Sequence, residues 1–494
     1  MTSTHTRPRF GRLLTLPGAL ALVVALAGNA SAVVPLTVVG EDPYTNTNSY
    51  HKTQVEPDSY SFGNTIVFTY QGGGRFNDGG SDDIGWATST DDGATWTFGE
   101  LPSTTVYATP AGPWDRISDP SVAYDPQDDT WMIASLAITG TIGKAVLVSR
   151  SFDGGLTWQA PVTVSQGGGS SFYDKSWIAC DTAAASAFYG NCYVEWDDAF
   201  QGNALKMSRS TDGGASWTAS TVPNASVIGG QPVVQPNGTV VMPITANGLQ
   251  SFKSTNGGVS YSGPFTISSI QTHGVNGGLR DGGGLVSAEV DASGKVYVAW
   301  QDCRFRSGCS SNDIVMSTSS DGQNWTAVVR IPIDGTSSTV DHFIPGIGVD
   351  HSTSGNTAHI GIAFYMYPKA NCSFSTCKLA AGFVESLDGG ATWTHVLRIL
   401  GPLRLRTLPS TTSGYMVGDY ISTSFNSAGQ AFPVLANTNS TQTCTLGQIT
   451  SCNEFMVTPT GGLAPREGSI PVSNDRVVAL GRSPRPVGAL GTAY

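Results

Sequence analysis

The chain has 494 residues, of which 13% are charged and 60 are glycine. This composition is typical of a β-rich globular protein with many turns, and it excludes a disordered chain, which needs high net charge and few apolar residues. The formal net charge of −11 argues against a nucleic-acid-binding surface, and no basic cluster follows residue 12.

The first 32 residues have the features of a secretory signal peptide. Arg7, Arg9 and Arg12 precede an apolar stretch, and the small residues at 30–32 (Ala-Ser-Ala) form a cleavage pattern. The apolar stretch is too short to anchor the chain in a membrane, and no later stretch is long and apolar enough to span one. We therefore expect a secreted, extracellular protein.

A short turn motif recurs six times along the chain. It begins with Ser, has Asp two residues later in five copies, and ends with Trp or Tyr. The copies stand at 89–96, 151–158, 210–217, 254–261, 319–325 and 386–393. The Asp carboxylate can accept backbone N–H bonds, Gly supplies positive φ, and the Trp ring can pack between sheets. These residues are predicted to hold hairpins and not to be catalytic.

Two short strands around a polar turn recur seven times, and six of these units are followed by the turn motif. The paired segments are 55–70, 118–135, 174–196, 230–243, 283–300, 343–364 and 419–435. Four antiparallel strands per unit predict an all-β fold, a β-propeller with seven blades and the repeated turns as hairpins. Six blades are the alternative if the first or last unit is irregular.

The two ends of the repeat region are expected to differ from its middle. The strand-like segment 35–40 is expected to complete the last blade, so residues 33–460 are assigned to the propeller. Residues 461–494 are rich in Gly, Pro and Arg and are assigned to a tail that wraps around it.

The eight cysteines fall into four close pairs. Local pairing is the simplest arrangement in an oxidising compartment, although many connectivities are open. A metal site is less favoured, because there is no Cys-x-x-Cys and the seven histidines are scattered. The expected disulfides are Cys180/Cys192, Cys303/Cys309, Cys372/Cys377 and Cys444/Cys452.

The turns resemble the Asp-box (BNR) repeat, Ser/Thr-x-Asp-x-Gly-x-x-Trp, and residues 50–460 resemble secreted bacterial proteins of the sialidase-like Asp-box family. The resemblance implies a glycan-active enzyme, above all a glycoside hydrolase of exo-α-sialidase type, with the boxes away from its active site. Two features depart from sialidases. The segment 115–120 (DRISDP) keeps Arg-Ile but shifts the Pro of the Arg-Ile-Pro signature, and known sialidase domains have six blades.

The residues just before the innermost strands are predicted to line one mouth of an axial pocket. They vary in a chain whose turns are regular, as expected for a binding site placed on a repeated scaffold. The equivalent positions are Glu56, Asp119, Lys175, Gln231, Leu285, Ile344 and Tyr420. Their neighbours are His51, Arg116, Asp174, Arg280, Asp281, Asp341, His342 and Asp419.

A sialidase holds the substrate carboxylate with clustered arginines, which bind it bidentately. The resemblance assigns this clamp to Arg116 and Arg280, with Arg75 or Arg304 as a third member, although Arg304 is favoured to pair with Asp302. The remaining expected substrate contacts are Lys175, Asp174, Asp281, His342 and His51.

The resemblance also assigns the reacting groups. Sialidases use a Tyr nucleophile activated by Glu, together with a general acid. Asp119 is the predicted general acid, Tyr420 the nucleophile and Glu56 its base, with Glu289 as an alternative base.

Two other functions stay open. A polysaccharide lyase acting on uronate-containing glycans would combine His51, His342 and Tyr420 with a Lys or Arg. The second open function is that of a non-catalytic propeller that binds glycan or protein, because Asp boxes also occur in proteins that are not enzymes. No cofactor is expected, with a calcium ion in the axial pocket left as an alternative, and the protein is expected to be a monomer with a glycan partner.

Overall fold

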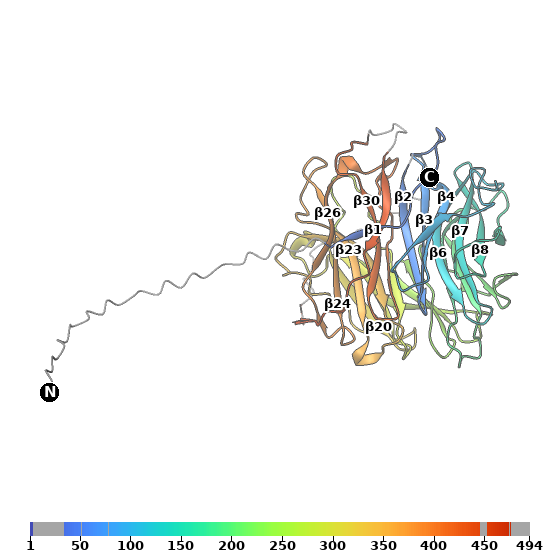
Figure 1. The fold of residues 1–494 in the computed structure, drawn as a ribbon. Helices are drawn as coiled ribbons and strands as arrows, with labels where there is room; N and C mark the ends of the chain where they lie inside the picture. The colour runs from blue at the N-terminus through green and yellow to red at the C-terminus, as the bar shows by residue number, and fades with distance from the viewer. Residues whose placement is uncertain (3–33, 51, 78, 445–451, 474, 476–494) are drawn as a thin grey trace. The chain divides into compact units, whose positions relative to one another are not determined.

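Antiparallel β-strands supply nearly all the regular structure of the chain, as the ribbon shows (Figure 1). The computed structural model describes residues 1–2, 34–50, 52–77, 79–444, 452–473 and 475. From Val34 onward these residues form one unit. The expected signal peptide, apart from residues 1–2, and the end of the expected tail lie outside the described residues. Among the described residues, no helix is long and apolar enough to cross a membrane.

The strands of this unit group into four-stranded antiparallel sets, which we number in chain order. Sets 1 and 2 form one eight-stranded sheet, because the single residue pair Ser81–Ile117 joins them. Set 1 is β2 (Gln54–Phe62), β3 (Thr65–Gly74), β4 (Ser81–Ser89) and β5 (Thr97–Glu100). Set 2 is β6 (Arg116–Asp125), β7 (Thr130–Thr139), β8 (Ile142–Ser151) and β9 (Val162–Gln166).

The next three sets are separate four-stranded sheets. Set 3 is β10 (Tyr173–Cys180), β11 (Cys192–Asp198), β12 (Ala204–Ser210) and β13 (Thr218–Ala219). Set 4 is β14 (Val233–Val234), β15 (Val240–Ala246), β16 (Gly248–Ser254) and β17 (Ser262–Ser268). Set 5 is β18 (Ser287–Val290), β19 (Val296–Asp302), β20 (Asp313–Ser319) and β21 (Val329–Arg330).

The last two sets complete the unit. Set 6 is β22 (Asp341–Val349), β23 (Ile360–Tyr367), β24 (Lys378–Ser386) and β26 (Leu397–Arg404). Set 7 is β29 (Ser422–Phe425), β30 (Ala431–Thr438), β31 (Glu454–Pro459) and β1 (Leu36–Val38). The N-terminal strand β1 pairs with β31, so the strand predicted at 35–40 does complete the last set (Figure 1). Two short two-stranded pairs account for the remaining described strands: β25 (Thr392–Trp393) with β32 (Ile470–Pro471), and the hairpin of β27 (Ser410–Thr411) with β28 (Gly414–Tyr415).

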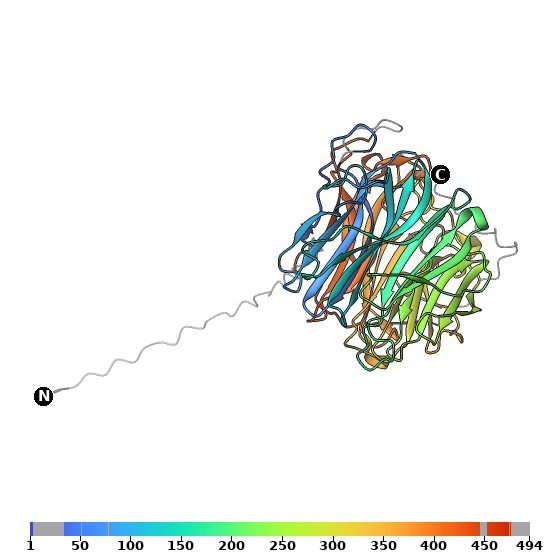
Figure 2. The ribbon, with the colours of Figure 1, turned by 90° about the vertical axis from the view of Figure 1, so that its right-hand side faces the viewer.

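Neighbouring sets contact each other mainly through their first strands. β2 lies beside β6, β6 beside β10, and so on through β14, β18 and β22 to β29, which also lies beside β2. Figure 2 shows the strands of sets 2 to 4, coloured cyan to green, side by side. Side chains cross these junctions: Asp58 accepts from the Val122 N–H (2.8 Å) and Ser121 from the Ile178 N–H (3.0 Å). Backbone donors near the middle of the unit are thereby satisfied.

The apolar core is divided among the gaps between neighbouring sets. One cluster joins Val67 and Ile84 of set 1 to Ile133 and Leu147 of set 2, and further clusters fill the gaps between later sets. The largest cluster combines residues of sets 6, 7 and 1. Each sheet is therefore buried on both faces by its neighbours, as the strongly apolar strand sequences require.

The six repeated turns have the predicted hydrogen bonds. In the copy at 151–158, the Asp153 carboxylate accepts from the hydroxyl of Ser151 (2.8 Å), the N–H of Thr157 (2.9 Å) and the hydroxyl of Thr157 (2.5 Å). Gly155 has φ +82°, and an added Cβ would lie 2.9 Å from Thr88 of set 1. Trp158 is buried in the cluster between sets 1 and 2. The turn thus fastens one sheet to its neighbour.

The cysteines pair locally. The disulfides are Cys180–Cys192, Cys303–Cys309, Cys372–Cys377 and Cys444–Cys452, the pairs expected from the sequence. Part of the predicted tail also has a defined place: β32 pairs with β25 at the repeated turn of set 6, and Arg466 donates to Glu385 of the same set (2.8 Å).

Candidate functional site

Four of the seven first strands contain a bulge near the N-terminal end, where the pairing register shifts. At each bulge one residue has a left-handed backbone: Glu56 (φ 56°), Asp119 (φ 46°), Lys175 (φ 52°) and Ile344 (φ 50°). Pro follows three of them, and Pro suits a position where the ladder bond is missing because it has no N–H. Such conformations cost about 1–3 kcal/mol each, so the surrounding contacts must hold them.

Three of these bulges bring charged side chains together in what we call the inter-sheet ion cluster: Glu56, Asp119, Lys175, Arg280 and Asp419. Nζ of Lys175 lies 2.8 Å from Asp419, 3.2 Å from Asp119 and 3.9 Å from Glu56. Arg280 donates to both carboxylate oxygens of Asp419, from Nε at 2.6 Å and from Nη2. Residues far apart in the sequence, and predicted to share a site, therefore do meet.

Tyr420 and Asp174 lie beside this cluster. The Tyr420 hydroxyl donates to the carbonyl oxygen of Pro120 (3.2 Å), and its ring packs edge-on against Trp177. Nζ of Lys175 lies 5.8 Å from the centroid of the Tyr420 ring. Asp174 accepts from the backbone N–H of Lys175 at 3.0 Å.

Burial and charge set different protonation states within the cluster. Burial raises the pKa of Glu56 to about 8, against the opposing effect of Lys175. Burial also raises the pKa of Asp419, but Arg280 and Lys175 lower it by more, so its net pKa falls below the usual range. Burial, reinforced by Glu56 and Asp119, raises the pKa of Tyr420 well above its usual value. At neutral pH Glu56 and Tyr420 thus keep their protons while Asp419 is ionised.

The ion cluster leaves little room for a substrate. The space lined by Asp119, Lys175 and Tyr420 is about 20 Å³, which suits one water molecule. Glu56, Asp119 and Lys175 are 2%, 4% and 8% exposed. A sugar ring does not fit beside these groups in this conformation.

A much larger space, the central cavity, lies further along the first strands. Its volume is about 560 Å³, within the range of small-ligand sites, and residues from all seven sets line it. Trp177 and Gln231 line both this cavity and the small space beside the ion cluster, so they stand between the two. The walls combine apolar and polar groups and include small side chains such as Ala123, Ala179 and Ala288.

Ionisable side chains gather in one part of the central cavity. Nε2 of His351 lies 3.2 Å from the Glu289 carboxylate, and the rings of His351 and Tyr60 have centroids 5.8 Å apart. Burial lowers the pKa of His351, but the hydrogen bond and charge of Glu289 raise it by more. Burial raises the pKa of Asp58 to about 7, although the Val122 N–H opposes this. The cavity therefore combines a carboxyl group that is partly protonated near neutral pH with a carboxylate paired to an imidazole.

The other predicted clamp arginines are engaged separately. Arg116 donates to the carbonyl oxygens of Asn77 (2.6 Å) and Gly79 (3.2 Å). Arg75 forms an ion pair with Asp82, and Arg304 forms one with Asp302 (2.7 Å), the pairing that the sequence favoured. Each of these three guanidinium groups thus has partners of its own, while Asp419 binds Arg280.

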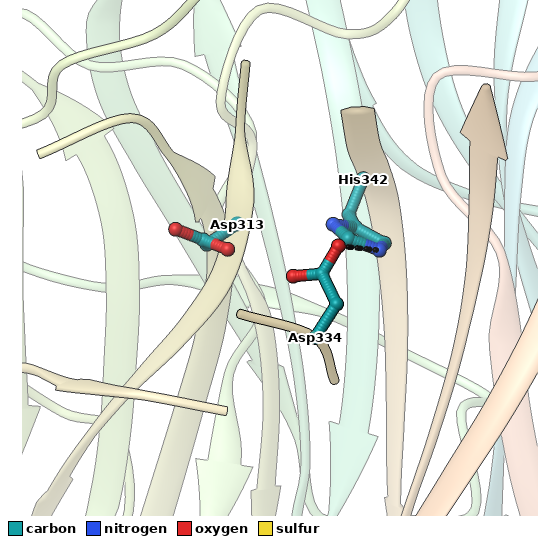
Figure 3. Close-up of side chains that lie close together, drawn as sticks. All are labelled: Asp313, Asp334 and His342. Carbon is teal, nitrogen blue, oxygen red and sulfur yellow. Dashed lines mark ion pairs between the residues drawn. The ribbon is translucent and has the colours of Figure 1, made fainter. Parts of the chain in front are cut away.

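His342, predicted to contact substrate, lies in a different buried charge cluster with Asp313 and Asp334 (Figure 3). Its Nε2 is 3.8 Å from Asp334, and burial lowers its pKa. These three residues have the spacing of metal ligands, but both carboxylates are already paired with arginines. Arg306 and Arg330 lie 2.5–2.9 Å from Asp313 and 2.5–2.8 Å from Asp334.

Two further predicted residues have less to contribute. Asp281, which follows Arg280 in the chain, is half-buried, and its carboxylate accepts a hydrogen bond from the Gln301 side chain at 2.9 Å. His51 lies outside the described residues.

The sequence pointed to the ion cluster and largely overlooked the central cavity. Among the cavity's ionisable residues only Glu289 was considered, as an alternative base, whereas Asp58, Tyr60 and His351 were not. The available signal was the presence of small residues in successive first strands, such as Ser121 and Ala123 in β6 and Ser287 and Ala288 in β18. Small side chains on neighbouring strands leave space where the strands converge.

Comparison with known proteins gives distant matches. No family model matches the chain, and no curated protein matches it. Solved structures similar to it include the Hadza microbial sialidase Hz136, with 15% identity, a TM-score of 0.43, and coverage of 64% of this chain and 65% of that one. A protein of unknown function from Dyadobacter fermentans DSM 18053 has 16% identity, a TM-score of 0.44, and coverage of 71% and 99%. Trypanosoma rangeli sialidase in complex with sialic acid has 11% identity, a TM-score of 0.43, and coverage of 87% and 57%. Matches this distant carry no argument about activity.

Proposed function

We propose that the protein is a secreted glycan-active enzyme of the glycoside hydrolase type, and that its substrate binds in the central cavity. The observation that carries this proposal is one cavity of about 560 Å³ with the carboxyl groups of Asp58 and Glu289 in its wall. Glycoside hydrolysis uses two carboxyl groups, one that donates a proton and one that acts as base or nucleophile. Environments that separate their protonation states are the physical basis of that division.

The roles follow from the surroundings of each carboxyl group. Asp58 has a pKa of about 7 because it is buried, so it is the proton donor to the leaving oxygen. Glu289 is partly exposed and paired with His351, so it is the base or nucleophile. Tyr60 and Trp177 offer aromatic faces for a sugar ring.

We also propose that the seven sets are the blades of one closed propeller of sialidase-like kind. Two contacts support this: β29 lies beside both β22 and β2, and β1 supplies the fourth strand of set 7. The four disulfides fit secretion.

An exo-α-sialidase centred on the ion cluster is the second candidate. It is favoured by the meeting of Arg280, Glu56, Asp119 and Tyr420, the residues that the sequence assigned to that chemistry. This candidate requires the cluster to open, because Arg280 is bound by Asp419 and the adjacent space is about 20 Å³. The first candidate needs no such movement.

The test is a screen of the mature protein against aryl glycosides, aryl sialosides and uronate polysaccharides, following phenol release and the ultraviolet absorbance of new double bonds. We expect phenol release from an aryl glycoside, reduced about 10²–10⁴-fold in Glu289→Gln. Glu467→Gln, at an exposed position, is the matched control. Turnover confined to sialosides and undiminished in Glu289→Gln would move the site to the ion cluster. New double bonds would identify a lyase, and an inert protein would remove the enzyme proposal.

A further inference from the structure

The central cavity has an unbalanced set of charges. Four acidic residues line it, Asp58, Glu289, Asp291 and Asp350, against one imidazole, His351. Among the described residues that line it, none is Lys or Arg. Asp58 and Asp291 are almost fully buried, and the lower dielectric constant around buried carboxylates strengthens their interaction with a bound charge.

These four acids differ in how many of their carboxylate oxygens already accept hydrogen bonds from the protein. Asp291 accepts from the N–H groups of Ser293 (2.9 Å) and Gly355 (2.9 Å), and Asp58 from Val122. Glu289 is bound on one side only: His351 contacts Oε2, and no described side chain hydrogen-bonds Oε1. Asp350 is similar, since only its Oδ1 accepts, from the N–H (2.9 Å) and hydroxyl (2.7 Å) of Ser352. Oε1 of Glu289 and Oδ2 of Asp350 are therefore available to a ligand.

We propose that the substrate of this cavity carries a protonated amine, that is, an amino sugar whose nitrogen is not acylated. This inference rests on the proposed function, since it names the substrate class of the same site. The ammonium group would donate to Oε1 of Glu289, while Tyr60 and Trp177 contact the apolar face of the ring. A sugar acid such as a sialate or uronate would instead meet four carboxyl groups, and the one potential cation in the wall, His351, is already paired with Glu289.

The proposed preference of the cavity for one sugar over another depends on the charge of the sugar and not on its shape. A free amine and its N-acetyl derivative share the same ring, but acetylation removes the positive charge and the charge-assisted hydrogen bond. The neutral parent sugar has a hydroxyl at the same position. Comparison of the three isolates the contribution of the charge.

The test is calorimetric titration with the S-methyl thioglycosides of glucosamine, N-acetylglucosamine, glucose and glucuronic acid, which resist hydrolysis. It is run at mildly acidic pH, where the amine is protonated, at low and at high salt. We expect the glucosamine derivative to bind at least tenfold more tightly than the others. High salt and Glu289→Gln should each reduce this preference, whereas Glu467→Gln should leave it unchanged. If Glu289→Gln fails to fold by circular dichroism, Asp350→Asn replaces it.

The outcomes separate this inference from the function on which it rests. Equal binding of the amine, acetylated and neutral sugars overturns the inference but leaves a glycan site in the cavity. Amine preference that persists in Glu289→Gln also overturns it, because the charge recognised then lies elsewhere. If none of the four thioglycosides binds, both the inference and the central-cavity proposal fail.

Discussion

The repeated turns and the bulged first strands are two kinds of repetition in one chain. The six turns repeat in sequence as well as in structure: Ser, Asp or Asn and Gly make the same hydrogen bonds at each. The bulges repeat in backbone only, because Glu56, Asp119, Lys175 and Ile344 share a left-handed conformation but not a side-chain type. The outer turns are closely similar parts of a scaffold, whereas the residue type differs at each of the inner positions.

This difference has a physical basis. A turn acts within its own hairpin and against one neighbouring sheet, so the same solution works at every copy. The bulges of sets 1 to 3 bring Glu56, Asp119 and Lys175 together, so their side chains must complement each other, and Lys175 also pairs with Asp419, which precedes β29. Identical residues there would repel.

Removal of Lys175 should give the largest change in stability. Lys175→Met leaves Asp119 and Asp419 buried with less compensating charge, and breaking a buried ion pair costs about 3–5 kcal/mol. Urea unfolding should show this loss, while Lys369→Met, at an exposed position, should stay near the wild type. Equal stability of the two variants would mean that the cluster does not hold the first strands together.

The ion cluster and the repeated turns should affect the pH dependence of stability in opposite directions: rising pH should weaken the contribution of the cluster and strengthen that of the turns. Glu56 has a folded pKa of about 8, above its unfolded value of 4.5, so its contribution is present below pH 4.5 and is lost as pH rises towards 8. Asp91 in a turn has a folded pKa of about 2, below 3.8, so its contribution is lost as pH falls from about 4 to 2.

We therefore expect maximal stability at mildly acidic pH, measured by urea unfolding across pH 2–9. Glu56→Gln should flatten the alkaline side of that profile, and Asp91→Asn should flatten the acidic side by a smaller amount, since Asp91 is exposed. A Glu56→Gln profile that matches the wild type would contradict the raised pKa.

A single turn should contribute less than the ion cluster. Asp153→Ala removes the acceptor for Ser151, Leu156 and Thr157, a loss of about 1–2 kcal/mol by analogy with helix caps. Asp153→Asn is the matched control, because the fourth copy already uses Asn256, which accepts from the Ser260 N–H at 3.1 Å. If both variants unfold at the wild-type urea concentration, the turns do not fasten the sheets.

The sequence allowed these two regions to be predicted to different depths. The turns were predictable bond by bond, because all the groups involved lie within eight residues. The meeting of Glu56, Asp119 and Lys175 was predictable from equivalent places in the repeat. The pairing of Arg280 with Asp419 was not, because neither residue occupies one of those equivalent places. The central cavity was harder still, because it depends on space left by small residues on seven separate strands.

A third group of charged residues consists of Asp313, Asp334 and His342 (Figure 3). We expect the smallest effect here: removing or adding metal ions should hardly change the thermal midpoint of unfolding. It has the residue types of a metal site, but Arg306 and Arg330 already supply the positive charge that an ion would bring. Treatment with a chelator should therefore change the thermal midpoint by less than about 1 °C, because only a ligand that binds the folded state stabilises it. Added calcium or zinc should likewise leave the midpoint unchanged. A rise on adding metal that Asp334→Asn abolishes would show that the arginines yield to an ion, and that this cluster is a binding site and not a closed set of ion pairs.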